Sequence, residues 1–415
     1  IGIGKEELWA SVVAGRSNVV RHDQYIHGEL WDSFYVSKIS NFDIKNIGLA
    51  PRFLEYMENN RLDEDPDLLY LMAAVKLALE DSRLGYDEAD NNIGLILTHE
   101  NPGVDRYVKK VFEVVMDCID GRMTGTRSKK EVAARLYEQH RQAVYNMQSF
   151  MYLHHVSKVF SLHGCSLFIN NACASGLFAI ETASQQIKSG KNGVVIVAGA
   201  DHPLFITKYL WFKALGLYAN HGIMRPFDRD RDGFVFGDGG SALVLEDADH
   251  AAERGATIYG EYLGGGFNQE AWKVSVPNVS EDFYTKAFRQ ALETSRIKPE
   301  QIDLVNPHGA ATKIADRYEA KTITDIFGHH PERVLISAFK PYVGHNLGGS
   351  ALLELAILLL ALQNDLVPPT LNYETPDPAL RIELNRDFVR RGLQVVAKMA
   401  NGFAGYNAVG IFGKL

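Results

Sequence analysis

The most constraining feature of this sequence is the segment Ala351–Leu362, which is apolar on nearly every face of a helix. A helix at a protein surface carries only one apolar stripe, so this helix must be enclosed by other elements. The run is too short to span a bilayer, and it contains the charged residue Glu354. We therefore expect a buried helix inside a globular protein, and no membrane contact.

The same strand, loop and helix order occurs twice. In the first unit a predicted strand ends at Ile169, a loop carries Cys173, and apolar spacing predicts a helix over Ser175–Lys188. In the second unit the predicted strand 334–339 leads through a lysine and a turn to His345, and the buried helix follows. Both units have a glycine three positions later and an inward-facing glutamate: Gly176 with Glu181, and Gly348 with Glu354. This similarity predicts a duplication with the two helices packed together, although two unrelated βα units would give the same pattern.

Cys173 has surroundings that suit a nucleophile. At the start of the helix 175–188, unpaired N–H groups and the helix dipole would stabilise a thiolate, so we expect a lowered pKa. The alternative is a buried cysteine that acts only as a small apolar residue. His308 and His345 favour the first interpretation, because each follows a predicted strand and open α/β sheets bind ligands at the carboxyl ends of their strands.

Composition excludes some classes of protein. The 415 residues are 46% hydrophobic and 23% charged, which allows a large core. A net charge of −8 argues against nucleic acid as a partner. The three cysteines, Cys118, Cys165 and Cys173, fit neither a disulfide framework nor a Cys-x-x-Cys metal site, so we expect a reducing, cytoplasmic location. No apolar leader opens the sequence, and we expect that some residues precede Ile1.

One apparent metal motif is rejected. Asp228–Gly233 copies the first half of an EF-hand loop, but position twelve is Gly239, where a bidentate glutamate must stand. We expect no metal there. The alternating arginines and aspartates are interpreted as internally paired charges that hold a loop.

Taken together, these segments resemble the β-ketoacyl synthases of the thiolase superfamily. The matching motifs are the nucleophile motif around Cys173, His308–Thr312 for His-Gly-Thr-x-Thr, Lys340–His345 for Lys-x4-Gly-His, Arg225–Gly240 for a long loop, and Gly402–Asn407 for Gly-Phe-Gly-Gly-Thr-Asn. The resemblance covers nearly the whole chain. It implies an α/β fold, the duplicated five-layered αβαβα arrangement with two mixed sheets around central buried helices. We expect its halves at 1–255 and 256–415, with a helical insert at about 104–150.

The resemblance also implies roles for single residues. Cys173 would carry the acyl group, and His308 and His345, as neutral rings, would donate N–H bonds to the extender. Lys340 would pair with Glu319 behind the histidines. The other implied sites are an oxyanion N–H and a gating ring at Phe403, and a pantetheine contact at Thr312.

Three residues depart from the family pattern. Ala310 replaces a threonine, which removes one hydroxyl contact to pantetheine worth roughly 0.5–1.5 kcal/mol. Ala404 replaces a glycine and Tyr406 replaces a threonine beside the gate, so we expect a stiffer gating loop and a reshaped acyl pocket.

The activity implied is a decarboxylative condensation of an acyl group on Cys173 with a malonyl group on an acyl carrier protein, without a cofactor. A homodimer, or a heterodimer with a related subunit, is implied as well. The departures favour a polyketide or polyene pathway over general fatty-acid synthesis. Two alternatives stay open: a non-catalytic partner subunit that sets chain length, and a cysteine hydrolase, which would leave His345 or His308 and Lys340 without a role.

The insert reverses the charge of the chain locally. From Val104 to Gln148 there are nine basic residues against six acidic ones: Arg106, Lys109, Lys110, Arg122, Arg127, Lys129, Lys130, Arg135 and Arg141. We hypothesise that the insert docks the acidic carrier protein or covers a dimer interface. An ordinary solvated helical pair is the alternative.

Overall fold

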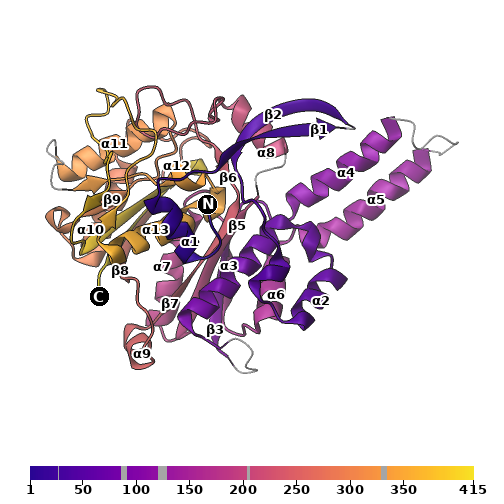
Figure 1. Ribbon diagram of the computed structural model, residues 1–415, viewed down its shortest axis with the longest axis horizontal. Helices are drawn as coiled ribbons and strands as arrows, with labels where there is room; N and C mark the ends of the chain where they lie inside the picture. Colours follow the sequence, from indigo (N-terminus) through magenta and orange to yellow (C-terminus); the bar gives the residue numbers. More distant parts are fainter. Residues whose placement is uncertain (27, 86–90, 120–128, 203–205, 329–333) are drawn as a thin grey trace.

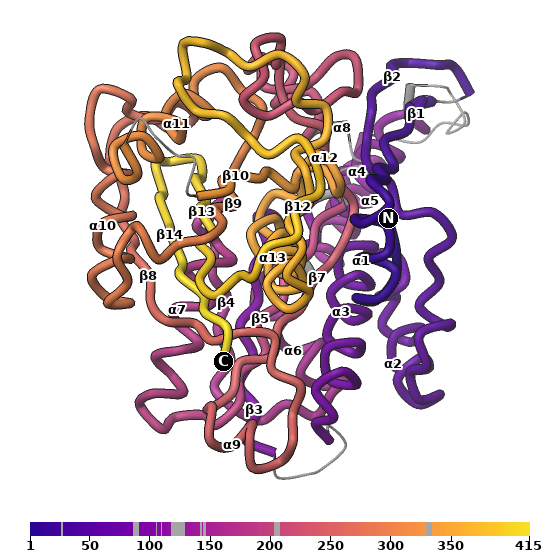
Figure 2. The backbone as a smooth tube through the Cα atoms, turned by 60° about the vertical axis from the view of Figure 1, so that its left-hand side comes forward, coloured from indigo at the N-terminus to yellow at the C-terminus, as the bar shows by residue number. Residues whose placement is uncertain are grey.

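Two mixed β-sheets organise the molecule (Figures 1 and 2). A computed structural model describes residues 1–26, 28–85, 91–119, 129–202, 206–328 and 334–415. The first sheet has the order β4-β3-β5-β7. It consists of β3 (Ile93–Thr98), β4 (Ser166–Ile169), β5 (Val194–Asp201) and β7 (Gly239–Glu246). The second sheet has the order β10-β9-β13-β14-β8. It consists of β8 (Glu261–Gln269), β9 (Leu304–Asn306), β10 (Leu335–Ile336), β13 (Val395–Gly402) and β14 (Tyr406–Gly413).

The two sheets repeat one topology. In each, three parallel strands are followed by an antiparallel one: β7 lies against β5, and β14 lies against β13. The second sheet continues with β8 on the far side of β14. In the described part of the chain, no strand occupies the matching edge of β7. The predicted duplication is therefore confirmed at the level of strand order.

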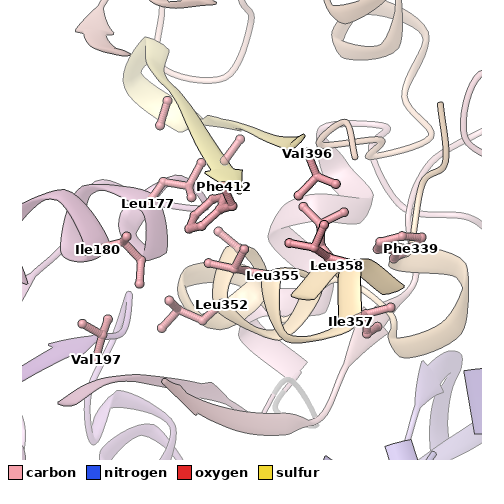
Figure 3. Close-up of a cluster of buried hydrophobic side chains, with 14 of the residues drawn as sticks. Leu177, Ile180, Val197, Phe339, Leu352, Leu355, Ile357, Leu358, Val396 and Phe412 are labelled. Atoms are coloured by element: carbon pink, nitrogen blue, oxygen red, sulfur yellow. The ribbon is translucent and has the colours of Figure 1, made fainter. Parts of the chain in front are cut away.

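Two helices lie between the sheets, α7 (Ser175–Lys188) and α13 (Ser350–Asn364). Figure 3 shows their side chains in one apolar cluster with both sheets: Leu177, Ile180, Leu352, Leu355, Leu358, Val197, Val396 and Phe412. The helices approach each other closely at Gly176, where an added Cβ would lie 2.9 Å from the Leu352 side chain. The prediction of a central buried helix is confirmed. By length and composition alone, Leu347–Asn364 could span a membrane, but 72% of this window is buried inside the protein.

Further helices cover the outer faces. α3 (Pro66–Ser82) and α6 (Ser149–Phe160) pack on the first sheet, and α10 (Phe283–Ser295) and α11 (Lys313–Phe327) pack on the second (Figure 1). The order is thus helix, sheet, helix, sheet, helix. This confirms the predicted five-layered α/β arrangement.

The predicted insert is a pair of antiparallel helices that projects from the body (Figure 1). The two helices are α4 (Val104–Ile119) and α5 (Lys129–Asn146), and Arg122 and Arg127 lie outside the described residues. A hairpin of β1 (Val19–Ile26) and β2 (Glu29–Ser37) projects near it, extended by β6 (Phe236–Gly237).

The remaining elements are short. They are α1 (Lys5–Val13), α2 (Pro51–Asn59), α8 (Ile206–Ala214), α9 (Ala248–Glu253), α12 (Lys340–Val343), β11 (Leu366–Val367), β12 (Val389–Arg390), and the 3-10 helices η1 (Ile44–Ile47), η2 (Leu62–Glu64), η3 (Pro299–Gln301), η5 (Leu347–Gly349) and η6 (Phe403–Gly405).

The loop Asp228–Gly233 is held by its charges, but mostly through partners outside the loop. Arg231 pairs with Asp377 at 2.8 Å and approaches Asp316 at 3.6 Å. The Asp228 carboxylate accepts backbone N–H bonds from Asp230 within the loop and from residues 374 and 375 beyond it. The interpretation of internally paired charges is confirmed for Arg229 and Asp230, which lie 3.3 Å apart, and needs correction for Arg231 and Asp228, whose partners come mostly from distant segments.

Candidate active site

Cys173, His308 and His345 meet at one cavity of about 360 Å³. Cys173 follows β4, His308 follows β9, and His345 follows α12, so loops from both sheets converge there. Ala310, Thr312 and Phe403 also line this cavity. The structure thus joins residues that are far apart in the sequence.

His345 has a defined tautomer. The Leu347 backbone N–H donates to its Nδ1 at 3.2 Å, and the Ser350 hydroxyl lies 2.9 Å from the same nitrogen. A nitrogen that accepts from an N–H carries no proton itself, so the proton of the neutral ring is on Nε2. His345 is therefore held as an Nε2–H donor.

His308 is held in the same way by Lys340. The Lys340 ammonium lies 3.3 Å from His308 Nδ1 and donates to the His308 carbonyl oxygen at 2.6 Å. Because an ammonium only donates, Nδ1 is the acceptor and the ring proton is on Nε2. The two rings meet edge to face with their centroids 5.3 Å apart. The site therefore presents a pair of imidazole N–H donors.

The predicted ion pair between Lys340 and Glu319 is wrong. Lys340 pairs with Glu354 at 2.5 Å, and the second oxygen of Glu354 binds Lys398 at 3.0 Å. Glu319 instead accepts the backbone N–H groups of His308 at 2.6 Å and Gly309 at 2.7 Å. The spacing of motifs could not reveal this exchange, because the partners come from α11, α12, α13 and β13.

Both histidines are neutral. Burial lowers the pKa of His308 well below its ordinary value, and Lys340, His345 and Lys398 lower it further. Burial, Lys340 and Lys398 lower the pKa of His345 in the same way. Burying an imidazolium beside two ammonium groups is unfavourable, so the uncharged rings are the stable form.

The expected low pKa of Cys173 is wrong for the resting site. Burial raises the pKa of the thiol well above its ordinary value, and the Glu100 carboxylate, 3.6 Å from Sγ, raises it further, while Lys340 opposes the rise. α7 begins only at Ser175, so the cysteine lies before the first turn of the helix. In the resting site, Cys173 is a thiol.

Phe403 lies beside the cysteine loop. At the preceding residue, Gly402, an added Cβ would lie 2.9 Å from the Asn171 carbonyl oxygen, so β13 can approach this loop only with glycine there. The Phe403 ring packs against Phe212, with centroids 5.4 Å apart, and Trp211, at 5.5 Å. Phe403 and Phe212 therefore form one aromatic part of the cavity wall.

The three other implied substrate residues differ in position. Thr312 caps α11, because its hydroxyl accepts the Ala315 N–H at 3.4 Å, and its own hydroxyl proton remains to be donated. Ala404 and Tyr406 do not line the cavity. Ala404 donates its N–H to the Val274 carbonyl at 2.6 Å, and the Tyr406 ring turns to Phe178.

Comparison with known proteins decides the family. The domain family described as "Beta-ketoacyl synthase, N-terminal domain" matches residues 1–251, and "Beta-ketoacyl synthase, C-terminal domain" matches residues 259–374. This chain belongs to the beta-ketoacyl synthase family. The resemblance stated from its motifs is confirmed.

Several relatives of this synthase resemble it over different lengths. The 3-oxoacyl-[acyl-carrier-protein] synthase 2 of Coxiella burnetii is 28% identical, and the match covers 98% of this chain and 94% of that protein. Nodulation protein E of Rhizobium leguminosarum bv. trifolii is 35% identical over 61% of this chain and 63% of its own length. Among solved structures, the ishigamide ketosynthase/chain length factor matches with a TM-score of 0.83 and 26% identity, covering 100% of this chain and 96% of that one. A beta-ketoacyl synthase from Burkholderia phymatum matches with a TM-score of 0.79 and 27% identity, covering 99% and 95%.

Three residues of this synthase site were not predicted from the sequence: Glu100, Ser350 and Lys398. Glu354 was noted, but its pairing with Lys340 was not predicted. Glu100 had a readable signal, because Thr98, His99 and Glu100 are polar residues directly after the apolar strand 93–97. Lys398 had another, because a lysine interrupts an otherwise apolar strand and must find a buried partner.

Proposed function

We propose that this chain catalyses the decarboxylative condensation of an acyl thioester, held on Cys173, with a malonyl group on an acyl carrier protein. The product is a β-ketoacyl group on the carrier. One observation supports this most strongly: a single cavity joins a buried thiol to two imidazoles fixed as Nε2–H donors. A cysteine hydrolase would need one histidine free to accept a proton, and neither is.

In the first half-reaction, the sulfur of Cys173 attacks the incoming thioester and forms an acyl-enzyme. The oxyanion of the tetrahedral intermediate needs two aimed donors. We assign them to the backbone N–H groups of Cys173 and Phe403. The close packing at Gly402 supports this assignment, because it holds the two chain segments together.

In the second half-reaction, the malonyl group loses carbon dioxide and negative charge develops on its thioester oxygen. His308 and His345 donate their Nε2–H groups to that oxygen and stabilise the enolate-like charge. Lys340 and Lys398 lie behind the rings and favour negative charge in the pocket, because Glu354 pairs with both lysines but compensates for only one of their two charges. The carbanion then attacks the acyl group on Cys173.

The substrates arrive on the phosphopantetheine arm of a carrier protein, and no separate cofactor takes part. Thr312, at the cavity wall, offers its hydroxyl proton to this arm, whereas Ala310 offers no hydroxyl. We place the enzyme in the cytoplasm and in a polyketide or fatty-acid pathway; polyketide synthases, nodulation proteins and 3-oxoacyl synthases all occur among its relatives.

A second subunit joins along β4. In the described chain β4 pairs only with β3, so its other edge is without a strand. Leu167 on this strand is 38% exposed, so an apolar side chain is available at this edge for a partner to cover. The partner is a second copy or a related subunit, as the name ketosynthase/chain length factor indicates for one structural relative.

That name also supports one alternative, in which this chain is a non-catalytic subunit that sets chain length. The presence of Cys173, His308, Lys340 and His345 in one site opposes it. An acyl adduct on this chain would exclude it.

The test is incubation with carrier proteins bearing different acyl groups, followed by intact mass measurement of the enzyme. We expect an adduct on the wild type and on Cys165→Ala, a matched free cysteine outside the cavity. Cys173→Ala should lose the adduct and keep malonyl decarboxylation, because the histidines remain. Absence of any adduct on the wild type would contradict the proposal.

A further inference from the structure

A carboxylate, Glu100, lies against the cysteine sulfur, and motif comparison gives it no role. Its Oε1 is 3.6 Å from Cys173 Sγ. The sheet explains this contact, because β3 and β4 are parallel and Thr98 pairs with Ile169. The two strands end at the same edge of the sheet, and residues 100 and 173 meet there.

The backbone around Glu100 is fixed. His99 accepts the Asn101 N–H on Nδ1 at 3.0 Å and contacts Asp67 through Nε2 at 3.1 Å. The Asn170 amide donates to the Glu100 carbonyl oxygen at 3.0 Å. At Gly348 an added Cβ would lie 3.2 Å from the Glu100 nitrogen, so the loop before α13 closes the other side. The backbone that carries the Glu100 carboxylate is therefore held in place by its neighbours.

The histidines cannot take the thiol proton. Each already carries a proton on Nε2, and each Nδ1 accepts from Leu347 or from Lys340. In the described residues, the hydrogen-bond contact of the Cys173 sulfur is with Glu100. Acyl transfer needs an acceptor for that proton, because the buried cysteine is a thiol at rest.

The surroundings of Glu100 give its carboxyl group a pKa that suits an acceptor of the thiol proton at neutral pH. Burial raises its pKa to about 7, and Asp201 on β5 raises it as well, while Lys208 on α8, Cys173 and His99 oppose the rise. Lys208 pairs with Asp201 at 2.7 Å, which limits the effect of that aspartate.

We propose that Glu100 is the general base for Cys173 in acyl transfer, which rests on the function proposed above. The Glu100 carboxylate takes the thiol proton as sulfur bonds to the thioester carbon. When the tetrahedral intermediate breaks its bond to the pantetheine sulfur, protonated Glu100 returns the proton to that leaving thiolate. No oxidation or reduction occurs, and Glu100 ends as a carboxylate.

The test separates proton transfer from packing by two reactions of the same thiol. The first is single-turnover acyl transfer from an acyl carrier protein, and the second is alkylation by iodoacetamide, both followed by intact mass from pH 6 to 9. Glu100→Gln keeps the shape and cannot accept the proton. Glu100→Asp keeps a carboxylate, and Glu58→Gln, on the exposed face of α2, is the control for loss of one acid.

We expect Glu100→Gln to slow acyl transfer at pH 7 about 100-fold, the usual size of a general-base effect. At pH 9 alkylation should stay equal or become faster, because more thiolate forms without a base there and the neighbouring negative charge that disfavours it is gone. Acyl transfer in this variant should recover with rising pH, as thiolate replaces the assisted thiol. Glu100→Asp should recover part of the rate, and Glu58→Gln should match the wild type.

Two results would overturn the inference while leaving the proposed function intact. Equal slowing of acyl transfer and alkylation that persists unchanged up to pH 9, where more thiolate forms without a base, would mean that Glu100 only supports the pocket. Acyl transfer at the wild-type rate or faster would mean that it takes no proton. If the wild type itself accepts no acyl group, the proposed function fails, and this inference fails with it.

Discussion

At the scale of single residues, the neutrality of His308 and His345 determines what the site can do. Only a neutral ring with a fixed Nε2–H donates to a developing oxyanion without holding a full charge in the buried site. Burial and the two lysines keep the pKa of both rings well below the ordinary value of 6.5. Their donor form should therefore persist in mildly acidic solution.

We predict that malonyl decarboxylation by Cys173→Ala stays constant from pH 7.5 to pH 6. A histidine with an ordinary pKa near 6.5 would be only about one quarter neutral at pH 6, and each ring would then cost about fourfold in rate. Release of carbon dioxide in single turnovers measures this. A fall of that size would contradict the depressed pKa values.

Unlike the decarboxylation rate, the stability of the protein should change over this pH range, so it must be measured as a control. The unfolded histidines take up protons near pH 6.5 while the folded ones do not, so the free energy of unfolding falls as pH drops below 6.5. The slope is at most about 1.4 kcal/mol per pH unit for each ring. Urea unfolding at each pH identifies the range in which the activity measurement is valid.

At the scale of elements, the contact between α7 and α13 connects the fold to the nucleophile. Cys173 lies in the loop directly before α7, and the loop before α13 carries His345, so their separation depends on how closely the helices pack. Gly176 sets that distance, because an added Cβ would lie 3.0 Å from both Ala351 Cβ and the Leu352 nitrogen. The helices could accept it only by moving apart.

We predict that Gly176→Ala lowers the free energy of unfolding by about 1–3 kcal/mol, the usual cost of overpacking. It should also slow acyl transfer more than malonyl decarboxylation, because Cys173 moves with α7. Gly193→Ala is the control, since a Cβ there meets nothing within 4 Å. A variant of Gly176 as stable and active as the wild type would show that the helices need not touch here.

Elements with strong local signals were predictable from sequence, and those set by tertiary contacts were not. The predicted helix 175–188 matches α7, because its apolar spacing is regular. The predicted strand 334–339 shrinks to β10, and Lys340 begins α12 where a turn was expected. Pro341, at the second position of α12, favours the start of a helix, but the apolar residues before it favoured the prediction of a strand. Glu181 was predicted to face inward like Glu354, yet it is half-buried and accepts from Tyr262.

At the scale of the whole molecule, the α4–α5 pair is the part that the core does not explain. It projects from the body (Figure 1), and some of its apolar residues are exposed, among them Tyr137 at 69%. Several of its basic residues are already paired: Arg106 and Lys110 with Glu64, Arg135 with Asp117, and Arg141 with Glu138. Only Glu64 adds an acidic residue from outside the insert, so these pairs reduce the charge excess of the insert without removing it. Lys129 and Lys130, exposed at the outer end of α5, are the best place to test docking.

We predict that reversing Lys129 and Lys130 to glutamate raises the KM for the carrier protein about tenfold and leaves kcat unchanged. Attraction between opposite charges speeds the association of the two proteins, and salt screens that attraction. The effect on KM should therefore shrink as salt is added. The control reverses Lys188 and Lys191, at the end of α7 away from Cys173. An unchanged KM would remove the docking hypothesis, and a change in oligomeric state would assign the helical pair to the subunit interface. The exposed Tyr137 supports this second possibility, a subunit interface, because apolar residues at a projecting surface are typical of contacts between subunits.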